Sequence, residues 1–214
     1  MSVRSMVGGL AAAVLCLAGP ALADDQTDAT EVGQRLGFDP DATRVGVDVQ
    51  AGVGFMTGDL GDRTAPGPML GITAGADPWR TLGIEVGYEG ERLPIDDIRV
   101  GDEQAMYRHN VSFLAKTGPR FVNDKLRPYI GAGVGLSYFD VTDGAKDTGL
   151  YTNDFVREVP LATGLDYQLT DSISAGARAS YRFLFGEEFA NPAELGGEAE
   201  GDLFNVGITV GGRF

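Results

Sequence analysis

The stretch FNVGITVGGRF, residues Phe204–Phe214, closes the chain with a regular alternation of side-chain types. Apolar residues occupy the even positions from 204 to 210 and position 214, while Asn, Gly, Thr and Arg fill the odd positions. Because successive side chains of a strand point to opposite faces, this period of two predicts a β-strand with one apolar face. The strand ends on an aromatic residue, Phe214, whereas most soluble domains end in a frayed polar tail.

The same alternation recurs in seven earlier segments of the 214-residue chain. In each segment one face carries Val, Ile, Leu, Ala or an aromatic residue, and the other carries mostly Gly, Ser and Thr with occasional charges. Together with the closing stretch they predict eight strands. The seven segments are residues 44–56, 69–77, 82–90, 105–118, 128–139, 159–169 and 172–185.

The connections between these segments alternate in length. Only Thr170 and Asp171 separate the sixth and seventh segments, whereas the long stretch GEEFANPAELGGEAEG, residues 186–201, follows the seventh. Such alternation is typical of barrels with short periplasmic turns and long extracellular loops. The sequence therefore predicts an all-β fold, an eight-stranded antiparallel up-and-down transmembrane β-barrel.

The composition of the polar face favours a membrane barrel over a soluble barrel of the lipocalin type. A surface that faces water should be rich in Lys and Glu, but here Gly, Ser and Thr dominate. Small residues suit the narrow interior of an eight-stranded barrel. The apolar face carries no charged residue in the central part of any segment, as hydrocarbon requires.

Aromatic residues collect near both ends of the expected strands, where they would form girdles at the two membrane interfaces. Those near the long connections are Phe55, Tyr88, Tyr107, Tyr138, Tyr181, Phe183, Phe185 and Phe204, and those near the short connections are Trp79, Tyr167 and Phe214.

The first 23 residues have the features of a secretory signal peptide. Arg4 supplies the positive start, an apolar stretch follows, and Ala21-Leu22-Ala23 provides a small-x-small cleavage site. Cys16, the single cysteine, lies inside this segment, so the mature protein would have no thiol. The expected division of the chain is a signal peptide at residues 1–23, cleaved after Ala23, an acidic periplasmic leader at 24–43 and the outer-membrane barrel at 44–214.

The formal net charge of −14 makes the chain strongly acidic. Nucleic-acid binding needs a basic surface, so a nucleic-acid partner is not expected. The signal peptide contains only one charged side chain, Arg4, and its removal would make the protein still more acidic.

The signal peptide, the eight alternating segments, RPYIGAGVGLSYF (127–139), TGLDYQLTDSISAGARASYRF (163–183) and the terminal Phe together resemble the OmpA/OmpX-type small outer-membrane barrels, within the broad outer-membrane β-barrel domain family. The resemblance covers residues 44–214. It implies an outer-membrane location, with lipid and lipopolysaccharide as neighbours. It also implies that the last strand is read by the barrel-assembly machinery, through Ile208, Val210 and Phe214. The family favours a further aromatic two residues before the end, where this chain has Gly212.

Ten charged residues fall on the polar face and should lie inside the barrel. Because a buried charge is costly unless it is paired, we expect them to form an ion-pair network across the lumen. The network would fill the barrel as a rigid core, with a gate as the alternative. Asp48, Glu85, Lys116, Asp166 and Arg213 should lie toward the periplasmic end, and Glu89, Arg108, Glu158, Arg178 and Arg182 should lie higher.

Neither an enzyme nor a cofactor is expected. His109 is the single histidine, and Ser112, three residues away on a strand, would lie on the opposite face. A nucleophile needs a base within hydrogen-bond reach, and no such set is visible.

Acidic residues crowd two of the long connections, one at 140–154 and one at 187–202. Carboxylates can bind divalent cations, which makes these loops candidate partners of Ca²⁺ or Mg²⁺. Their spacing matches no ordered calcium loop, so a solvated acidic surface is favoured and no metal site is assigned.

The sequence thus predicts an integral outer-membrane protein with a structural or interaction role, a lumen largely filled by side chains, and acidic surface loops. A narrow porin-like channel or carrier for small solutes is the alternative, and a lipid-modifying outer-membrane enzyme is the third possibility.

Overall fold

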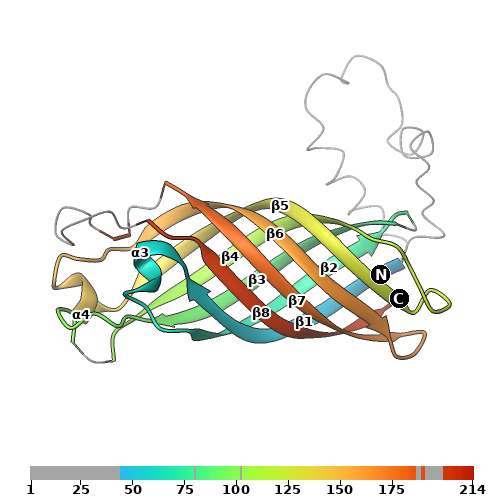
Figure 1. Cartoon of the computed structure of the whole chain (residues 1–214), viewed down its shortest axis with the longest axis horizontal. Coiled ribbons are helices and arrows are strands. Elements are labelled where there is room, and N and C mark those ends of the chain that lie inside the picture. The colour runs from blue at the N-terminus through green and yellow to red at the C-terminus, as the bar shows by residue number, and fades with distance from the viewer. Residues whose placement is uncertain (1–43, 80, 102, 187–188, 191–199) are drawn as a thin grey trace, which may run out of the picture.

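The computed structural model describes residues 44–79, 81–101, 103–186, 189–190 and 200–214. They form a closed antiparallel barrel in which each strand pairs with the next in the chain, so the predicted fold is confirmed (Figure 1). The expected signal peptide and leader lie outside the described residues. The strands are β1 Arg44–Met56, β2 Gly67–Asp77, β3 Leu82–Pro94, β4 Ala105–Thr117, β5 Leu126–Val141, β6 Asp154–Gln168, β7 Ile173–Phe185 and β8 Leu203–Arg213.

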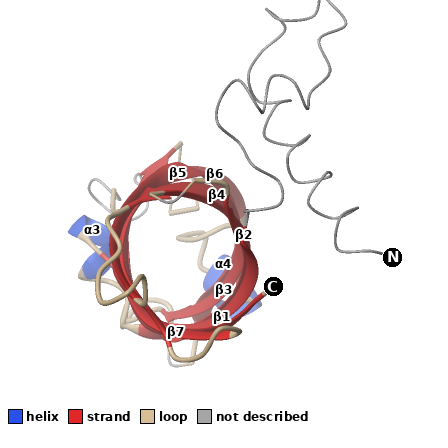
Figure 2. Ribbon diagram, turned by 90° about the vertical axis from the view of Figure 1, so that its right-hand side faces the viewer, coloured by secondary structure: helices blue, strands red, loops and turns tan. Residues whose placement is uncertain are grey.

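The first and last strands close the barrel. Strands β1 and β8 pair antiparallel from Gly46 opposite Arg213 to Met56 opposite Leu203. The view along the barrel shows the resulting ring (Figure 2). Every strand therefore has two partners, which leaves no open sheet edge for a membrane to accommodate.

The two ends of the barrel differ in the length of the connections between strands. Residues 78–81, 118–125 and 169–172 join strands at one end, hereafter the short-turn end. The longer connections, residues 57–66, 95–104, 142–153 and 186–202, join the strands that end at the opposite, long-loop end. Two helices of four residues, α3 Gly58–Gly61 and α4 Asp143–Lys146, belong to these loops. Within the described residues no helix is long and apolar enough to cross a membrane.

Several strands run farther toward the long-loop end than their alternation suggested. The largest extension is in β6, which begins at Asp154, whereas the sequence segment begins at Val159. Proline lacks an N–H for the sheet ladder and usually marks the start or edge of a strand, which explains why Pro160 concealed the extension.

Pro160 leaves one gap in the β5–β6 ladder. Pairs are present between Ala132 and Leu161 and between Gly135 and Glu158, but the two intervening pairs are absent. A single missing donor explains both, because the hydrogen bond from the N–H of residue 160 to the Gly133 carbonyl would support both pairs.

Replacing Pro160 with valine should restore this bond. We expect Pro160→Val to be more stable than Pro128→Val by about 1 kcal/mol, the net contribution of one hydrogen bond. Pro128 is the matched control, because it lies in β5 with its β6 pair to Leu165 intact and shares the entropy change of losing a proline. Urea unfolding of both variants in detergent measures the difference, and equal midpoints would mean that the gap has another cause.

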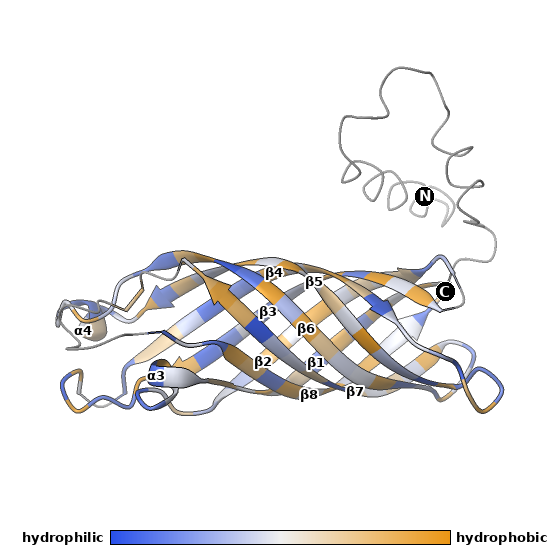
Figure 3. Ribbon diagram, turned by 45° about the horizontal axis from the view of Figure 1, so that its top comes forward, coloured by the Kyte–Doolittle hydropathy of each residue, from blue (hydrophilic) through white to orange (hydrophobic). Residues whose placement is uncertain are grey.

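The outer face of the barrel is a continuous apolar surface. Leu70, Val111, Ile130, Val134 and Ile208 are each more than half exposed. Figure 3 shows hydrophobic and hydrophilic residues alternating along the strands. Soluble monomers rarely expose contiguous apolar patches beyond a few hundred Å², so this surface is suited to lipid.

Aromatic pairs border the apolar surface toward the long-loop end. Phe55 and Phe204 have ring centroids 5.1 Å apart, and Tyr181 and Phe183 are 5.0 Å apart. Near the short-turn end, Tyr167 and Phe214 are exposed. Aromatic side chains at both borders of an apolar surface are typical of the two interfaces of a membrane.

Candidate functional site

Three groups of side chains follow one another inside the barrel from the long-loop end, and further ion pairs lie beyond them at the short-turn end. Apolar residues form the first group, and two ionic layers follow. All three arise from the positions of each strand that point inward, together with residues of the long loops that fold over the barrel mouth.

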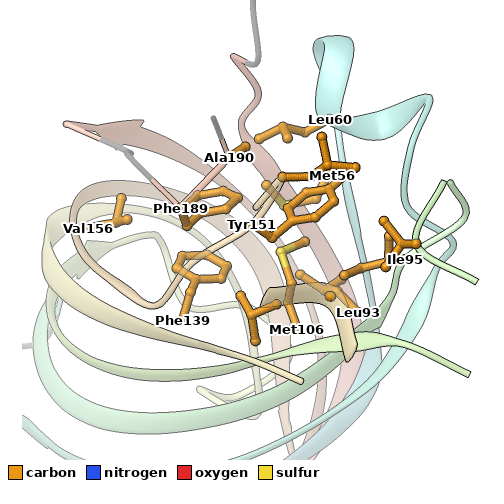
Figure 4. Close-up of a cluster of buried hydrophobic side chains, with 14 of the residues drawn as sticks. Met56, Leu60, Leu93, Ile95, Met106, Phe139, Tyr151, Val156, Phe189 and Ala190 are labelled. Carbon is orange, nitrogen blue, oxygen red and sulfur yellow. The ribbon is translucent and has the colours of Figure 1, made fainter. Parts of the chain in front are cut away.

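The apolar group, hereafter the apolar plug, occupies the long-loop end (Figure 4). Phe139 of β5 is fully buried and stacks on Phe189 of the last long loop, with ring centroids 4.5 Å apart. The plug thus joins strand ends to loop residues from distant parts of the chain. Its members are Met56, Leu60, Leu93, Ile95, Val100, Met106, Phe139, Val141, Ala145, Leu150, Tyr151, Val156, Leu184, Phe189, Ala190 and Leu203.

The sequence-based prediction did not include the plug, although the pattern of inward-facing residues contains a signal for it. In β3, Leu93 has the same parity as Glu89, and in β5, Phe139 has the same parity as Ser137. The inward face therefore changes from polar to apolar near the long-loop end. The loop members have no such periodicity, and only the folded chain shows that they cover the barrel mouth.

Below the plug lies the upper ionic layer, which consists of Glu89, Glu91, Arg108, Glu158 and Arg182. Arg108 is fully buried and donates from Nε to Glu158 Oε1 at 2.9 Å and from Nη2 to Glu158 Oε2 at 2.8 Å. Its Nη1 donates to Glu91 Oε2 at 3.3 Å. Arg182 pairs with Glu89 and donates from Nη1 to Glu158 Oε2 at 3.0 Å.

Neutral side chains complete the hydrogen bonding of Glu158. Asn110 donates from Nδ2 to Glu158 Oε2 at 3.0 Å, and the Ser137 hydroxyl donates to Glu158 Oε1. Such additional bonds are what a buried ion pair needs to offset the loss of hydration. The parity of Asn110 and Ser137 places them inside, but their role depends on which residues the fold brings opposite them.

The lower ionic layer consists of Glu85, Lys116, Asp166 and Arg178. Lys116 pairs with Glu85, and its Nζ lies 3.1 Å from Asp166 Oδ2. Arg178 Nη1 lies 3.1 Å from Glu85 Oε2. The sequence reading placed Arg178 higher in the barrel, and the structure corrects this: Arg178 belongs with Glu85, because the tilt of β7 changes which levels meet across the lumen.

Further ion pairs lie at the short-turn end. Arg213 Nη1 is 2.7 Å from Asp48 Oδ2. Asp77 binds both Arg127, at 2.6 Å, and Arg120, at 2.9 Å. The sequence reading included Asp48 and Arg213, so each of its ten lumen residues lies in an ion pair of the described structure. It omitted Glu91, which lies beyond its third segment, and Arg120 and Arg127, which it assigned to a connection. It also omitted Asp77, although this residue is on the polar face at the end of its second segment.

Little space remains between the lower ionic layer and the Asp48–Arg213 pair. A cavity of about 10 Å³ lies there, bordered by Asp77, Glu85 and Lys116 as well as by that pair. A volume of this size holds about one water molecule. The charged interior is therefore packed rather than open at this level.

The two residues considered for chemistry, His109 and Ser112, have different surroundings. His109 is exposed on the outer face, where its Nδ1 is 2.7 Å from the Tyr88 hydroxyl. Ser112 lies on the opposite face of β4, as its spacing predicts. A base and its nucleophile must lie within hydrogen-bond reach, and these two side chains point to opposite sides of the barrel wall.

The residues expected to form the assembly signal lie along the outer face of β8. Ile208 and Val210 are exposed there, and Phe214 is 76% exposed. The Phe214 backbone N–H donates to the Val45 carbonyl at 2.8 Å, so the terminal residue still belongs to the β1–β8 closure.

The acidic loops are partly described. Asp140 and Asp143 share Lys146, at 3.5 and 3.6 Å. Asp202 accepts a hydrogen bond from the Tyr181 hydroxyl at 2.8 Å. Glu187, Glu188, Glu194 and Glu198 lie outside the described residues. Within the described part of the chain, no three acidic, histidine or cysteine side chains are arranged to hold a metal ion.

A second acidic surface lies between the loops at 57–66 and 95–104. It borders an open groove of about 520 Å³ with four aspartates and two arginines along it. Hydrogen bonds from Arg99 to Asp97 lower the pKa of Asp97 to about 2. Arg63 also pairs with Asp97, at 3.4 Å. Asp97 therefore stays ionised and holds the two arginines at the groove.

A closed barrel with an apolar outer face, aromatic borders and a packed ionic interior defines the chain as a small transmembrane β-barrel protein. The family model of the outer membrane protein beta-barrel domain matches residues 9–214, so the chain belongs to this family. The protein is accordingly an integral outer-membrane protein of a Gram-negative envelope, in contact with lipid and lipopolysaccharide.

Solved structures of small outer-membrane barrels share the fold. Neisserial surface protein A (NspA) is similar with a TM-score of 0.58 and 18% identity, over 79% of this chain and 97% of that chain. Ail of Yersinia pestis has a TM-score of 0.55 and 10% identity, over 80% and 99%. OprG from Pseudomonas aeruginosa has a TM-score of 0.50 and 13% identity, over 80% and 95%. No curated protein sequence matches this chain significantly.

Proposed function

We propose that this protein is a closed outer-membrane barrel with a structural and interaction role, in which the loops meet the exterior and the lumen does not conduct. The observation that carries the proposal is the apolar plug above a fully buried Arg108. A hydrated ion would have to displace the Phe139–Phe189 stack and then break the bonds between Arg108 and Glu158.

Each of these steps is costly on general grounds. Opening a packed apolar cluster loses its contacts and exposes it to water. Breaking a buried ion pair leaves charges without partners in a region that water does not reach. The two obstacles lie in series along the barrel axis, so removing one leaves the other in place.

The acidic loops support the interaction role. The long-loop end presents the Asp59 to Arg99 groove and the carboxylates near α4, on a chain of net charge −14. Such a surface favours cationic partners, or divalent cations that bridge carboxylates to lipopolysaccharide phosphates. We propose this bridging role for the loops, with the terminal strand and Phe214 as the signal for the barrel-assembly machinery and cleavage after Ala23.

Single-channel recording tests the closed lumen. We expect the refolded protein to give no current steps in a planar bilayer at either moderate or high salt. Faster migration of the unheated sample on electrophoresis would verify that the barrel is folded. Reproducible current steps that change in size in Glu158→Gln would instead establish the second candidate, a narrow channel with the upper ionic layer as its gate.

A further inference from the structure

The upper ionic layer has one more carboxylate than it has cations. Among the described residues, the cations that pair with Glu89, Glu91 and Glu158 are Arg108 and Arg182, and all five side chains are buried. Guanidinium groups keep their charge at any accessible pH, so each contributes one positive charge. The lower ionic layer, by contrast, is balanced, with two carboxylates against Lys116 and Arg178. If every carboxyl group were ionised, the upper layer would hold an uncompensated buried negative charge.

Within the described residues, two buried oxygens beside the upper ionic layer have no hydrogen-bond donor, and they indicate where the excess charge lies. They are Glu91 Oε1 and Asn205 Oδ1. The other oxygen of Glu91 accepts from Arg108, and the Asn205 amide nitrogen lies 3.0 Å from Met69 Sδ. The two free acceptors lie near each other, since both adjoin the point that a Cβ at residue 54 would occupy, with Asn205 Oδ1 3.1 Å from it. Gly54 therefore leaves the room that the Glu91 carboxyl group uses.

The groups around Glu91 explain why this carboxyl group differs from the others. Its charged neighbours are Glu89 on its own strand, Arg108 on β4, Glu158 on β6 and Arg182 on β7. In the part of the chain that the structure describes, the strands on its other side contribute uncharged groups, which are Gly54 of β1, Met69 of β2 and Asn205 of β8. Glu158 and Glu89 each pair with both arginines, but Glu91 has a single contact, with Arg108.

We propose that the folded barrel binds one proton at Glu91, which donates it as a hydrogen bond to Asn205 Oδ1. This proton supplies the missing donor, satisfies both free acceptors and makes the upper ionic layer neutral. A metal ion in the same place would need about six oxygen ligands, whereas two are free. The proton site lies directly beneath Leu93 and Leu203 of the apolar plug, so its loss would place an uncompensated charge against that plug.

The proposal predicts the sign of a pH dependence. In the unfolded chain Glu91 would ionise near the usual range for glutamate, so above about pH 5 the folded state would bind one more proton than the unfolded state. Stability then falls as pH rises, and the folding equilibrium constant should drop by about tenfold per pH unit until the folded barrel also loses the proton.

Urea unfolding of the full refolded chain in detergent, between about pH 5 and about pH 8, tests this dependence. Wild type should lose stability with rising pH relative to Glu91→Gln, which keeps the hydrogen-bonding shape without a titrating group. Glu85→Gln, in the balanced lower layer, is the matched control and should retain the slope of wild type at a lower midpoint. Parallel profiles of wild type and Glu91→Gln would overturn the proposal.

Infrared spectroscopy supplies a readout on the wild-type protein itself, and variants then assign the signal. Wild type at neutral pH should show the carbonyl band of a protonated carboxylic acid, and Glu91→Gln should lack it. Asn205→Leu, which removes the acceptor, should lose the band at a lower pH than wild type. Absence of the band in folded wild type would overturn the proposal, as would a pH profile that moves with sodium concentration at constant ionic strength, since the site would then hold a metal cation.

Discussion

Replacing Arg108 with methionine is expected to lower the free energy of unfolding of the barrel by about 3–5 kcal/mol, the usual cost of removing one partner of a buried ion pair. Arg108 has no exposed surface and donates to Glu158, Glu91 and Ser137. Methionine fills much of the same volume, so the loss would come mainly from the carboxylates left without a cation rather than from a cavity.

The origin of the effect can be separated from simple loss of packing. The double variant Arg108→Met/Glu158→Gln also removes the carboxylate that accepts two hydrogen bonds from Arg108. This double variant should therefore be more stable than Arg108→Met alone. Comparison with the two single variants gives the coupling energy of the pair. Urea unfolding in detergent at neutral pH measures all four proteins. A loss below about 1 kcal/mol for Arg108→Met would place the pair among the weak surface bridges, contrary to its burial.

Replacing Phe139 with alanine should cost a similar amount, about 3–5 kcal/mol, by leaving a cavity in the apolar plug. Phe139 is fully buried and stacks on Phe189 at an interplanar angle of 18°. Because Phe189 belongs to a loop, removal of the Phe139 ring on which it stacks should also release that loop from the barrel mouth. We therefore expect faster amide hydrogen exchange at the long-loop end, with the strands near Arg213 still protected.

Phe155→Ala is the matched control for this variant. Phe155 is the second residue of β6 and lies close to Phe139 in the ladder, but it is 65% exposed on the outer face and pairs with Tyr138. Its removal loses contact with detergent or lipid and should change stability far less than Phe139→Ala. If both variants lost the same stability, the buried stack would contribute no more than the outer aromatic border, and the plug would not be the packed obstacle that the closed lumen requires.

Local side-chain pattern determined the strands, their number and their membrane environment. The period of two in residues such as Val206, Ile208 and Val210 assigns each position to one of two faces, because a strand has only two. The absence of charges from one face then identified it as the lipid side. The same parity placed Arg108, Glu158 and Arg182 inside the barrel without any knowledge of their neighbours.

The tertiary structure alone decided which inward residues meet. Partners across a barrel depend on strand tilt and stagger, which the closure of β1 on β8 fixes for the whole ring, and no single segment encodes them. Arg178 consequently pairs with Glu85 rather than with the higher group. Glu91 joined the upper ionic layer because β3 continues past the end of its clear alternation.

The apolar plug was likewise decided only by the folded chain. Leu60, Tyr151 and Phe189 come from three different long loops, where no period links one apolar residue to another. One such loop is too short to enclose these side chains by itself, and burial becomes favourable only when the closed barrel brings the loops over one mouth. Sequence periodicity thus specified the wall of the barrel, because it is a local property, while the contents of the lumen depended on contacts between residues far apart in the chain.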